Sequence, residues 1–371
     1  MTQRPETGRA IRKEPGRAQT RQRSETGRAA RMLHKAGTKP AKTSEVTSFA
    51  DACDFVGVFA DDREAWLLAR HATYGGSEAS AIMGLNPYVE PIEIYANHVA
   101  EPSGEEESAS EAAHWGNLLE RPILEEYARR SGDRLMFGGA LLRSKEHPLL
   151  ACTLDAELCR SHDNIGSAQV KTTVLEEDWK THDQGFAEWT VPVYVQIQVQ
   201  HELLVTRAPW AETIVLPLRS RQMKNFPTVP HAEFQALLLS KIVEMDRRVQ
   251  SRNPPDVQGT ESSRRALKKL FPEDTQESVK LIGADWLDKR DELERLGDLR
   301  RQVKKREDQL KAEFCLEIAD ATFGDLDDGR FFSLKTSTKK VYECSECDHL
   351  HRSEPFRTLR PCKAPNSKSK R

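Results

Sequence analysis

The sequence lacks any long apolar segment. No apolar run approaches the roughly 18 residues that a membrane-spanning helix requires, and no apolar stretch follows the N-terminus as in a secretory signal. Cysteine is also scarce, with seven residues, an odd number, scattered over a chain of 371. These absences exclude a membrane-spanning protein and a small disulfide-stapled one. We therefore expect a soluble protein of a reducing intracellular compartment, long enough for one large domain or two ordinary ones.

Charge is unevenly distributed along the chain. Residues 1–45 contain twelve Lys or Arg and four Glu, a net charge of +8, whereas the remaining residues sum to −10. This stretch has little to bury and repeats Glu-Thr-Gly-Arg-Ala at 6–10 and 25–29, so residues 1–48 are predicted to be a disordered basic arm. Three interpretations of the arm stay open: loose contact with nucleic acid, a targeting peptide, or a translation start at Met32.

The rest of the chain shows a mixed pattern of apolar residues. Spacings of three and four predict helices at 63–70, 112–130, 232–249 and 285–320. Strand-like segments lie at 134–142, 149–158, 165–174, 213–218 and 331–336. Ser77 occupies an N-cap position, and residues 193–204 fit a helix and a strand equally well. The order of these elements predicts an α/β fold, with one main domain at 49–255, a charged helical extension with a short hairpin at 256–340, and a basic Cys/His-containing tail at 341–371.

One group of residues could perform chemistry. Glu120 lies inside a predicted helix, Asp155 ends a predicted strand, and Gln169-Val170-Lys171 lies on the next one, with Gln169 and Lys171 on the same face. Two carboxylates and a lysine form a site for a hard divalent cation such as Mg²⁺. Such a cation stabilises the charge that develops on a phosphodiester, while the lysine positions or helps to deprotonate a water molecule.

Four blocks in this order resemble the YqaJ-type viral recombinase family, which includes the phage lambda exonuclease. The blocks are Trp66-Leu-Leu-Ala-Arg70 with Gly75-Gly-Ser-Glu-Ala-Ser80, Trp115-Gly-Asn-Leu-Leu-Glu120, Ala151-Cys-Thr-Leu-Asp155 with Gln169-Val-Lys171, and Tyr194-Val-Gln-Ile-Gln-Val-Gln-His201 with Val205-Thr-Arg207. Together they span about residues 60–220. The resemblance implies a PD-(D/E)xK restriction-endonuclease-like core, that is, a mixed central sheet flanked by helices, with a C-terminal helical and hairpin extension.

The resemblance also implies an activity. Family members degrade one strand of linear double-stranded DNA from its 5′ end, with Mg²⁺ or Mn²⁺, beside a single-strand annealing protein, and often as a homo-oligomeric ring. Glu120, Asp155, position 169 and the Val170 carbonyl then correspond to metal ligands, and Lys171 to the catalytic lysine. The positions that match the 5′-phosphate pocket are Arg70, Ser77, Thr153 and Gln198. Alternatively, Ser77 only caps a helix and Gln198 only satisfies a buried backbone group.

Two positions depart from the family pattern. Gln169 stands where the family has Glu or Asp, and Ala156 stands where Gly usually follows the aspartate. A glutamine oxygen can coordinate Mg²⁺ but brings no charge. Glu157, on the same strand face as Asp155, either supplies the missing charge or is an ordinary surface residue. Two alternatives follow: a catalytically impaired protein that binds DNA ends, or a nuclease with another polarity or an endonucleolytic action.

The C-terminal tail contains a possible zinc site. Cys344 and Cys347 form a Cys-x₂-Cys pair, and His349 and Cys362 follow at spacings that match no standard zinc motif. The residue types are those that structural Zn²⁺ prefers. Free thiols in a flexible basic tail are the competing interpretation.

Overall fold

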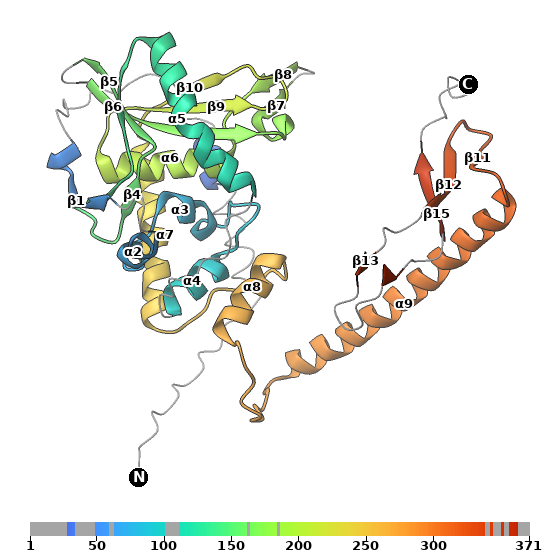
Figure 1. Cartoon of the computed structure of the whole chain (residues 1–371). Coiled ribbons are helices and arrows are strands. Elements are labelled where there is room, and N and C mark those ends of the chain that lie inside the picture. Colours follow the sequence, from blue (N-terminus) through green and yellow to red (C-terminus); the bar gives the residue numbers. More distant parts are fainter. Residues whose placement is uncertain are drawn as a thin grey trace. The chain divides into compact units, whose positions relative to one another are not determined.

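The computed structural model describes residues 28–33, 49–58, 63–100, 111–161, 164–183, 186–337, 342–343, 350–351 and 356–362. The chain divides into two compact units, Met1–Asp274 and Thr275–Arg371 (Figure 1). The first unit contains all the residues that the sequence assigns to the nuclease site.

A five-stranded sheet forms the centre of the first unit, with the strand order β10-β9-β6-β5-β2. Its strands are Arg134–Phe137 (β2), Ala156–Ser161 (β5), Asn164–Thr173 (β6), Ala211–Pro217 (β9) and Lys224–Thr228 (β10). β6 pairs with β9 in parallel, and the other three pairs are antiparallel. The predicted α/β class with a mixed central sheet is therefore confirmed.

Two long helices lie on opposite faces of this sheet, α5 (Glu111–Ser131) and α6 (Val193–Thr206). Alternate residues of β6 point to opposite faces. Ala168 and Val170 accordingly pack with Ile123 and Leu124 of α5. Gln169, between them, is turned the other way and bonds to Gln198 of α6. Residues 193–204, ambiguous from the sequence, are thus helical.

The first unit contains further helices and strands (Figure 1). The helices are Phe49–Asp51 (η1), Arg63–Arg70 (α2), Gly76–Ile82 (α3), Pro91–Val99 (α4), Glu176–Trp179 (η2), Ala232–Gln250 (α7) and Glu261–Leu270 (α8). Cys53–Val58 (β1), Ala140–Ser144 (β3) and Ala151–Thr153 (β4) form a second sheet, and Lys180–Asp183 (β7) pairs with Phe186–Trp189 (β8). The main core fills the space between α3, α4, α6 and α7 and contains the fully buried Ile92, Ile197, Phe234 and Leu238.

Two predicted strands are each broken in the middle. The segment 134–142 divides into β2 and β3 at Gly138-Gly139, and the segment 149–158 divides into β4 and β5 at Leu154-Asp155. The two breaks lie side by side, because the Gly138 N–H donates to the Asp155 carbonyl at 3.0 Å and the Gly139 N–H donates to the Leu154 carbonyl at 3.1 Å. The prediction of continuous strands is wrong here because each of the two segments passes from one sheet to the other: β2 and β5 belong to the five-stranded sheet, and β3 and β4 to the three-stranded one.

Part of the N-terminal arm is not disordered. Residues 28–33 are helical, and Ala29 and Leu33 are buried in the main core. Met32 packs against the same core, so these three residues form an apolar face with helical spacing. The prediction of a disordered arm is therefore wrong for these six residues; the rest of the 1–48 segment lies outside the described residues.

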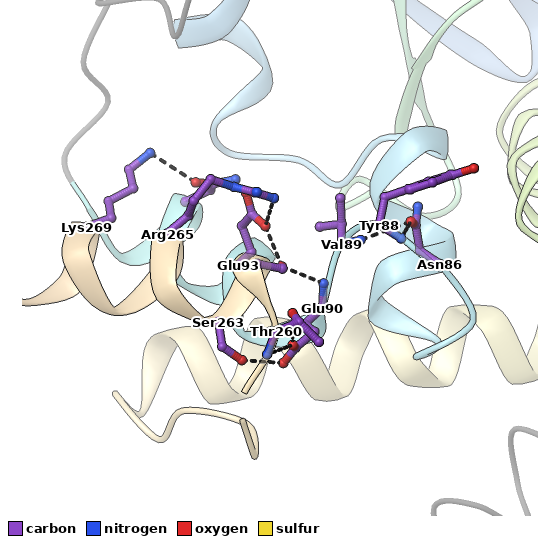
Figure 2. A network of polar contacts seen from close by, with 11 residues as sticks. Asn86, Tyr88, Val89, Glu90, Glu93, Thr260, Ser263, Arg265 and Lys269 are labelled. Carbon is purple, nitrogen blue, oxygen red and sulfur yellow. Dashed lines mark hydrogen bonds and ion pairs between the residues drawn. The ribbon is translucent and has the colours of Figure 1, made fainter. Parts of the chain in front are cut away.

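The first unit also extends beyond the predicted boundary at residue 255. Helix α8 packs on α4 through a network of polar contacts (Figure 2). The carboxylate of Glu90 accepts hydrogen bonds from Gln258 N at 2.9 Å, from Ser263 Oγ at 2.7 Å and from both the N–H and the hydroxyl of Thr260. Glu90 thereby satisfies free backbone N–H groups at the start of α8, and the change of composition after Pro255 does not end the unit.

A second cluster continues this contact along α8. Glu93 forms an ion pair with Arg265 at 2.7 Å and accepts a hydrogen bond from Ser262, and Lys269 donates to the Asn97 side chain at 3.0 Å (Figure 2). The α4–α8 contact is therefore mainly polar.

We expect Glu90→Gln to lower the free energy of unfolding by about 2 kcal/mol at pH 7, because a buried, charged acceptor of several hydrogen bonds is lost. Burial opposes ionisation, but hydrogen bonds from Thr260, Ser263 and Gln258 hold the pKa of Glu90 below its usual value. A carboxyl with a lowered pKa stabilises the fold above its unfolded pKa and loses this effect as the pH falls through the folded pKa. Urea denaturation should therefore show a difference that shrinks below about pH 4.5. Glu261→Gln, at an exposed position of α8, should have little effect at any pH.

The second unit contains a helix of 35 residues, α9 (Ala284–Ile318), and a small sheet. This sheet consists of Phe323–Asp325 (β11), Phe331–Ser337 (β12) and Phe356–Cys362 (β15), and Tyr342–Glu343 (β13) pairs with Leu350–His351 (β14). Phe314 of α9 packs on Phe332 of β12, with ring centroids 4.5 Å apart. The helix predicted at 285–320 and the strand predicted at 331–336 are both present. Among the helices that the structure describes, none is long and apolar enough to cross a membrane.

Candidate functional site

Asp155 lies at the break between β4 and β5, where its backbone is held by the glycine pair of the neighbouring break. Its side chain turns towards β6: Oδ2 accepts hydrogen bonds from the Val170 backbone N–H and from the Gln169 side-chain Nε2, each at 2.6 Å. Asp155 is thus fixed against the strand that carries Lys171.

Glu120 of α5 and Lys171 of β6 complete the predicted acidic and basic set. Burial and the negative charge of Asp155 raise the pKa of Glu120 to about 7, and the positive charge of Lys171 opposes this shift. Burial also raises the pKa of Asp155, against the Lys171 charge and the hydrogen bond from Val170. The three side chains therefore lie within electrostatic range of one another, although they come from a helix and two strands.

Gln169 connects Asp155 to α6. Its side chain is buried, and while Nε2 donates to Asp155, Oε1 accepts a hydrogen bond from Gln198 Nε2 at 2.6 Å. Gln198 Nε2 also donates to Glu202 Oε1 at 3.0 Å. A continuous chain of side chains runs from Asp155 through Gln169 and Gln198 to Glu202, and we call it the amide chain.

Glu202 was not among the predicted site residues. It is 1% exposed, and its Oε2 has no hydrogen-bond partner among the described residues. Burial, together with repulsion from Asp155, raises the pKa of Glu202 to about 8, while Lys171 and the Gln198 hydrogen bond oppose the shift. A helical assignment of 193–204 could have revealed this residue, since Gln198 and Glu202 are four apart and share a helix face.

Arg70 and Thr153, two of the predicted phosphate-binding residues, are linked by Trp66. The Arg70 guanidinium lies 4.3 Å from the centre of the Trp66 ring, and Trp66 Nε1 donates to Thr153 Oγ1 at 3.4 Å. Arg70 also forms an ion pair with Glu78 at 3.4 Å. Burial opposes ionisation of Glu78, but His98 and Arg70 lower its pKa to about 2.

Gln198 and Ser77 lie on opposite sides of a close contact between α3 and α6. A Cβ at Gly76 would lie only 3.1 Å from Gln198 Cγ, so a larger residue there would require Gln198 to shift by a few tenths of an ångström. Ser77 is the exposed neighbour of Gly76. The prediction that Ser77 caps α3 is wrong: Gly75 is the N-cap, and the Glu78 carboxylate accepts the Gly75 N–H at 2.7 Å.

Oxygen donors for a divalent cation gather around Asp155. Within the described part of the chain, no three His, Cys, Asp or Glu side chains form a group that could hold a metal ion. The available donors are two carboxylates, from Glu120 and Asp155, with the Gln169 amide and the Val170 carbonyl. This all-oxygen set, next to a buried carboxyl oxygen without a partner, suits Mg²⁺ or Mn²⁺.

The predicted zinc ligands Cys344, Cys347 and His349 lie outside the described residues. Cys362 ends β15 and forms no disulfide. The possible zinc site in the tail therefore stays a prediction.

Comparisons with known proteins agree with the sequence motifs. Residues 65–209 match the family model of the YqaJ-like viral recombinase domain. The uncharacterised protein YqaJ of Bacillus subtilis (strain 168) is 25% identical over 268 residues, which cover 71% of this chain and 80% of that protein.

Two solved structures are similar to part of the chain. An alkaline exonuclease (LHK-Exo) from Laribacter hongkongensis has 17% identity and a TM-score of 0.41, covering 56% of this chain and all of that one. A phage-related exonuclease from Haemophilus somnus 129PT has 10% identity and a TM-score of 0.36, covering 48% of this chain and 94% of that one.

Proposed function

We propose, from the match of residues 65–209 to the YqaJ-like viral recombinase domain, that this chain is a metal-dependent nuclease that degrades linear double-stranded DNA from the 5′ end. The observation that carries the proposal is the convergence of Glu120, Asp155 and Lys171, which come from three separate elements: the charges of Asp155 and Lys171 act on the pKa of Glu120, and the charge of Lys171 acts on the pKa of Asp155. Two acids can hold a divalent cation, and a lysine beside them can assist the water that attacks a phosphodiester.

In this proposal Glu120, Asp155, the Gln169 amide and the Val170 carbonyl hold the cation. When bound, Mg²⁺ or Mn²⁺ supplies Lewis-acid stabilisation of the charge that develops on the phosphodiester. Lys171 Nζ donates hydrogen bonds to the attacking water and stabilises the negative charge that grows on it as it loses its proton. The Asp155 side chain is already oriented for this role by the Val170 N–H.

The polarity of digestion comes from a second set of side chains next to the first. Arg70 offers a fork of donors to a terminal phosphate, and Ser77, Thr153 and Gln198 add neutral hydrogen bonds. Trp66 keeps Arg70 and Thr153 together, and Gln198 belongs to the amide chain that ends on Asp155. A bound 5′-phosphate would therefore be held at a fixed position relative to the cation site. The ring-shaped oligomer and the single-strand annealing partner stay predictions of the family resemblance.

A second candidate function is binding of DNA ends without hydrolysis. The Gln169 amide directs its Nε2, and not its oxygen, towards Asp155, and the oxygen accepts a hydrogen bond from Gln198. This orientation favours a weakened cation site and hence an impaired nuclease.

The deciding experiment is digestion of 5′-phosphorylated linear duplex DNA with Mg²⁺ or Mn²⁺, with circular duplex in parallel. Release of mononucleotides from the linear form alone supports the proposed nuclease. End binding without release under either metal supports the second candidate, and nicking of the circle points to endonucleolytic action.

We expect Arg70→Ala to reduce the preference for 5′-phosphorylated over 5′-hydroxyl ends by roughly tenfold to a hundredfold, since one charge-assisted contact to phosphate is worth about 1.5–3 kcal/mol. Initial rates on the two substrates measure this ratio directly. Arg264→Ala, at an exposed position of α8, is the matched control and should leave the ratio unchanged. An unaltered ratio in Arg70→Ala would remove Arg70 from the phosphate pocket.

A further inference from the structure

Glu202 is a buried carboxyl group with a hydrogen-bond partner on only one of its two oxygens. Its Oε1 accepts a hydrogen bond from Gln198 at 3.0 Å, whereas its Oε2 has no partner among the described residues. A buried charged or polar group without a partner is destabilising. Glu202 is linked to the predicted cation ligands through Gln198 and Gln169, so a cation bound there would favour its ionised form.

The other buried acids of the first unit differ from Glu202. Glu212 accepts hydrogen bonds from Arg160 at 3.2 Å and from a second side chain, and Glu78 is paired with Arg70. Glu90, also buried, has no ion pair in the described part of the chain, but its two carboxylate oxygens accept hydrogen bonds from Gln258, Thr260 and Ser263. Each of these acids therefore has a partner on both carboxylate oxygens. Glu202 instead receives one hydrogen bond from a neutral amide, and the positive charge that acts on it is that of Lys171, across the site.

Glu202 lies close to Gln169, the neutral residue at the position where the motif has an acid. Gln198 Nε2 donates both to Gln169 Oε1 at 2.6 Å and to Glu202 Oε1 at 3.0 Å, so these two oxygens are at most 5.6 Å apart. Position 169 is where the motif expects an acid. A carboxylate on α6 therefore lies within 5.6 Å of the terminal oxygen of the neutral residue that replaces this acid.

We propose that Glu202 replaces the missing acid of position 169: it balances the charge of a divalent cation held by Glu120 and Asp155, acting through Gln198 and Gln169. This inference rests on the proposed metal-dependent nuclease and explains how that site functions with a glutamine. Glu202 is a charge-balancing residue, since the amide chain separates it from Asp155. Glu120 of α5, Asp155 at the break between β4 and β5, and Glu202 of α6 then provide three acids for the cation.

The test is calorimetric titration of the metal-free protein with Mn²⁺, with DNA digestion measured in parallel. Glu202→Gln should weaken Mn²⁺ binding by about 10- to 100-fold, the range for losing a partner that acts through a ligand. The double variant Gln169→Glu with Glu202→Gln should regain affinity within a few-fold of the wild type, because the acid returns to the motif position. Glu157→Gln is the matched control, since burial alone accounts for the raised pKa of Glu157, and it should bind Mn²⁺ as the wild type does.

Thermal melting separates this role from a structural one. Without metal, Glu202→Gln should melt no lower than the wild type, because an amide replaces an unpartnered carboxyl; with Mn²⁺, the rise in melting temperature should be reduced. A lower melting temperature in both conditions, with unchanged Mn²⁺ affinity, would assign Glu202 to folding and overturn the inference. Should Glu202→Gln not fold, Glu202→Met, which is apolar and similar in volume, tests the same loss of charge.

The remaining outcomes distinguish this inference from the proposed function. If Glu157→Gln weakens Mn²⁺ binding and Glu202→Gln does not, Glu157 balances the cation, and the inference fails while the nuclease stands. If the wild type binds no Mn²⁺ and digests no DNA, the proposed function fails and the inference falls with it. Loss of affinity in Glu202→Gln and its recovery in the double variant support the inference.

Discussion

Lys171→Ala should lower the rate of DNA hydrolysis about a thousandfold and leave Mn²⁺ binding nearly intact. Lys171 shares the polar face of β6 with Gln169 and is the positive charge that opposes the raised pKa values of Glu120 and Asp155. Removing a group that positions and stabilises an attacking water costs about 10²–10⁴ in rate, whereas the oxygen donors to the cation remain. Single-turnover digestion of 5′-phosphorylated linear duplex measures the loss.

Lys241→Ala is the matched control for this prediction. Lys241 lies on α7 and pairs with Glu244 at 3.6 Å, so its loss should change neither hydrolysis nor Mn²⁺ binding. Wild-type rates in Lys171→Ala would exclude Lys171 from the chemistry. Loss of both hydrolysis and Mn²⁺ binding would instead assign Lys171 to the integrity of the site.

Strong periodicity made part of the fold predictable. The helix expected at 112–130 is α5, and the strand expected at 165–174 is β6. The spacing of apolar residues in each segment fits one type of secondary structure. Residues 193–204 could not be assigned, since apolar residues alternate there with glutamines that are themselves buried or half-buried. A helix that is packed on most of its surface loses the polar face by which a sequence reveals it.

The candidate site was predictable where its residues lie in motifs. Asp155 and Lys171 were predicted because they lie in blocks that resemble the YqaJ-type family, and their roles stay a prediction. The sequence did not reveal Glu202 as a residue of the site, nor the role of Trp66 in linking Arg70 and Thr153. Both depend on where α6 and α2 pack, which is a long-range property of the fold. Glu202 also belongs to none of the quoted motifs, and only its burial and its hydrogen bond to Gln198 show that it belongs to the site.

The breaks in two predicted strands have a common cause. A run of strand-forming residues predicts a strand, but it carries no information on which sheet each half joins. Gly138-Gly139 and Leu154-Asp155 are hydrogen-bonded to each other at the point where each of the two segments passes from one sheet to the other. The crossing places Asp155 at the end of β5 and next to β6, so the geometry of the site depends on this contact.

Gly138→Ala should therefore destabilise the first unit by about 3 kcal/mol, the upper part of the range for overpacking. A Cβ at Gly138 would overlap the Leu154 carbonyl oxygen and lie 2.6 Å from the Leu154 carbonyl carbon and 3.0 Å from that of Asp155. These atoms belong to the backbone, so no side-chain rotation can relieve the overlap. Asp155 must shift, and Mn²⁺ binding should weaken together with stability.

Gly116→Ala provides the matched control, because a Cβ there meets nothing within 4 Å and alanine is favoured over glycine in the helix α5 by up to about 1 kcal/mol. Urea denaturation followed by circular dichroism should show Gly138→Ala less stable than the wild type and Gly116→Ala equal or more stable. Equal stability of Gly138→Ala would mean that the two breaks do not touch as the structure places them. Since the hydrogen bond from the Gly138 N–H to the Asp155 carbonyl is one of the two that join the breaks, the position of Asp155 would then need another support.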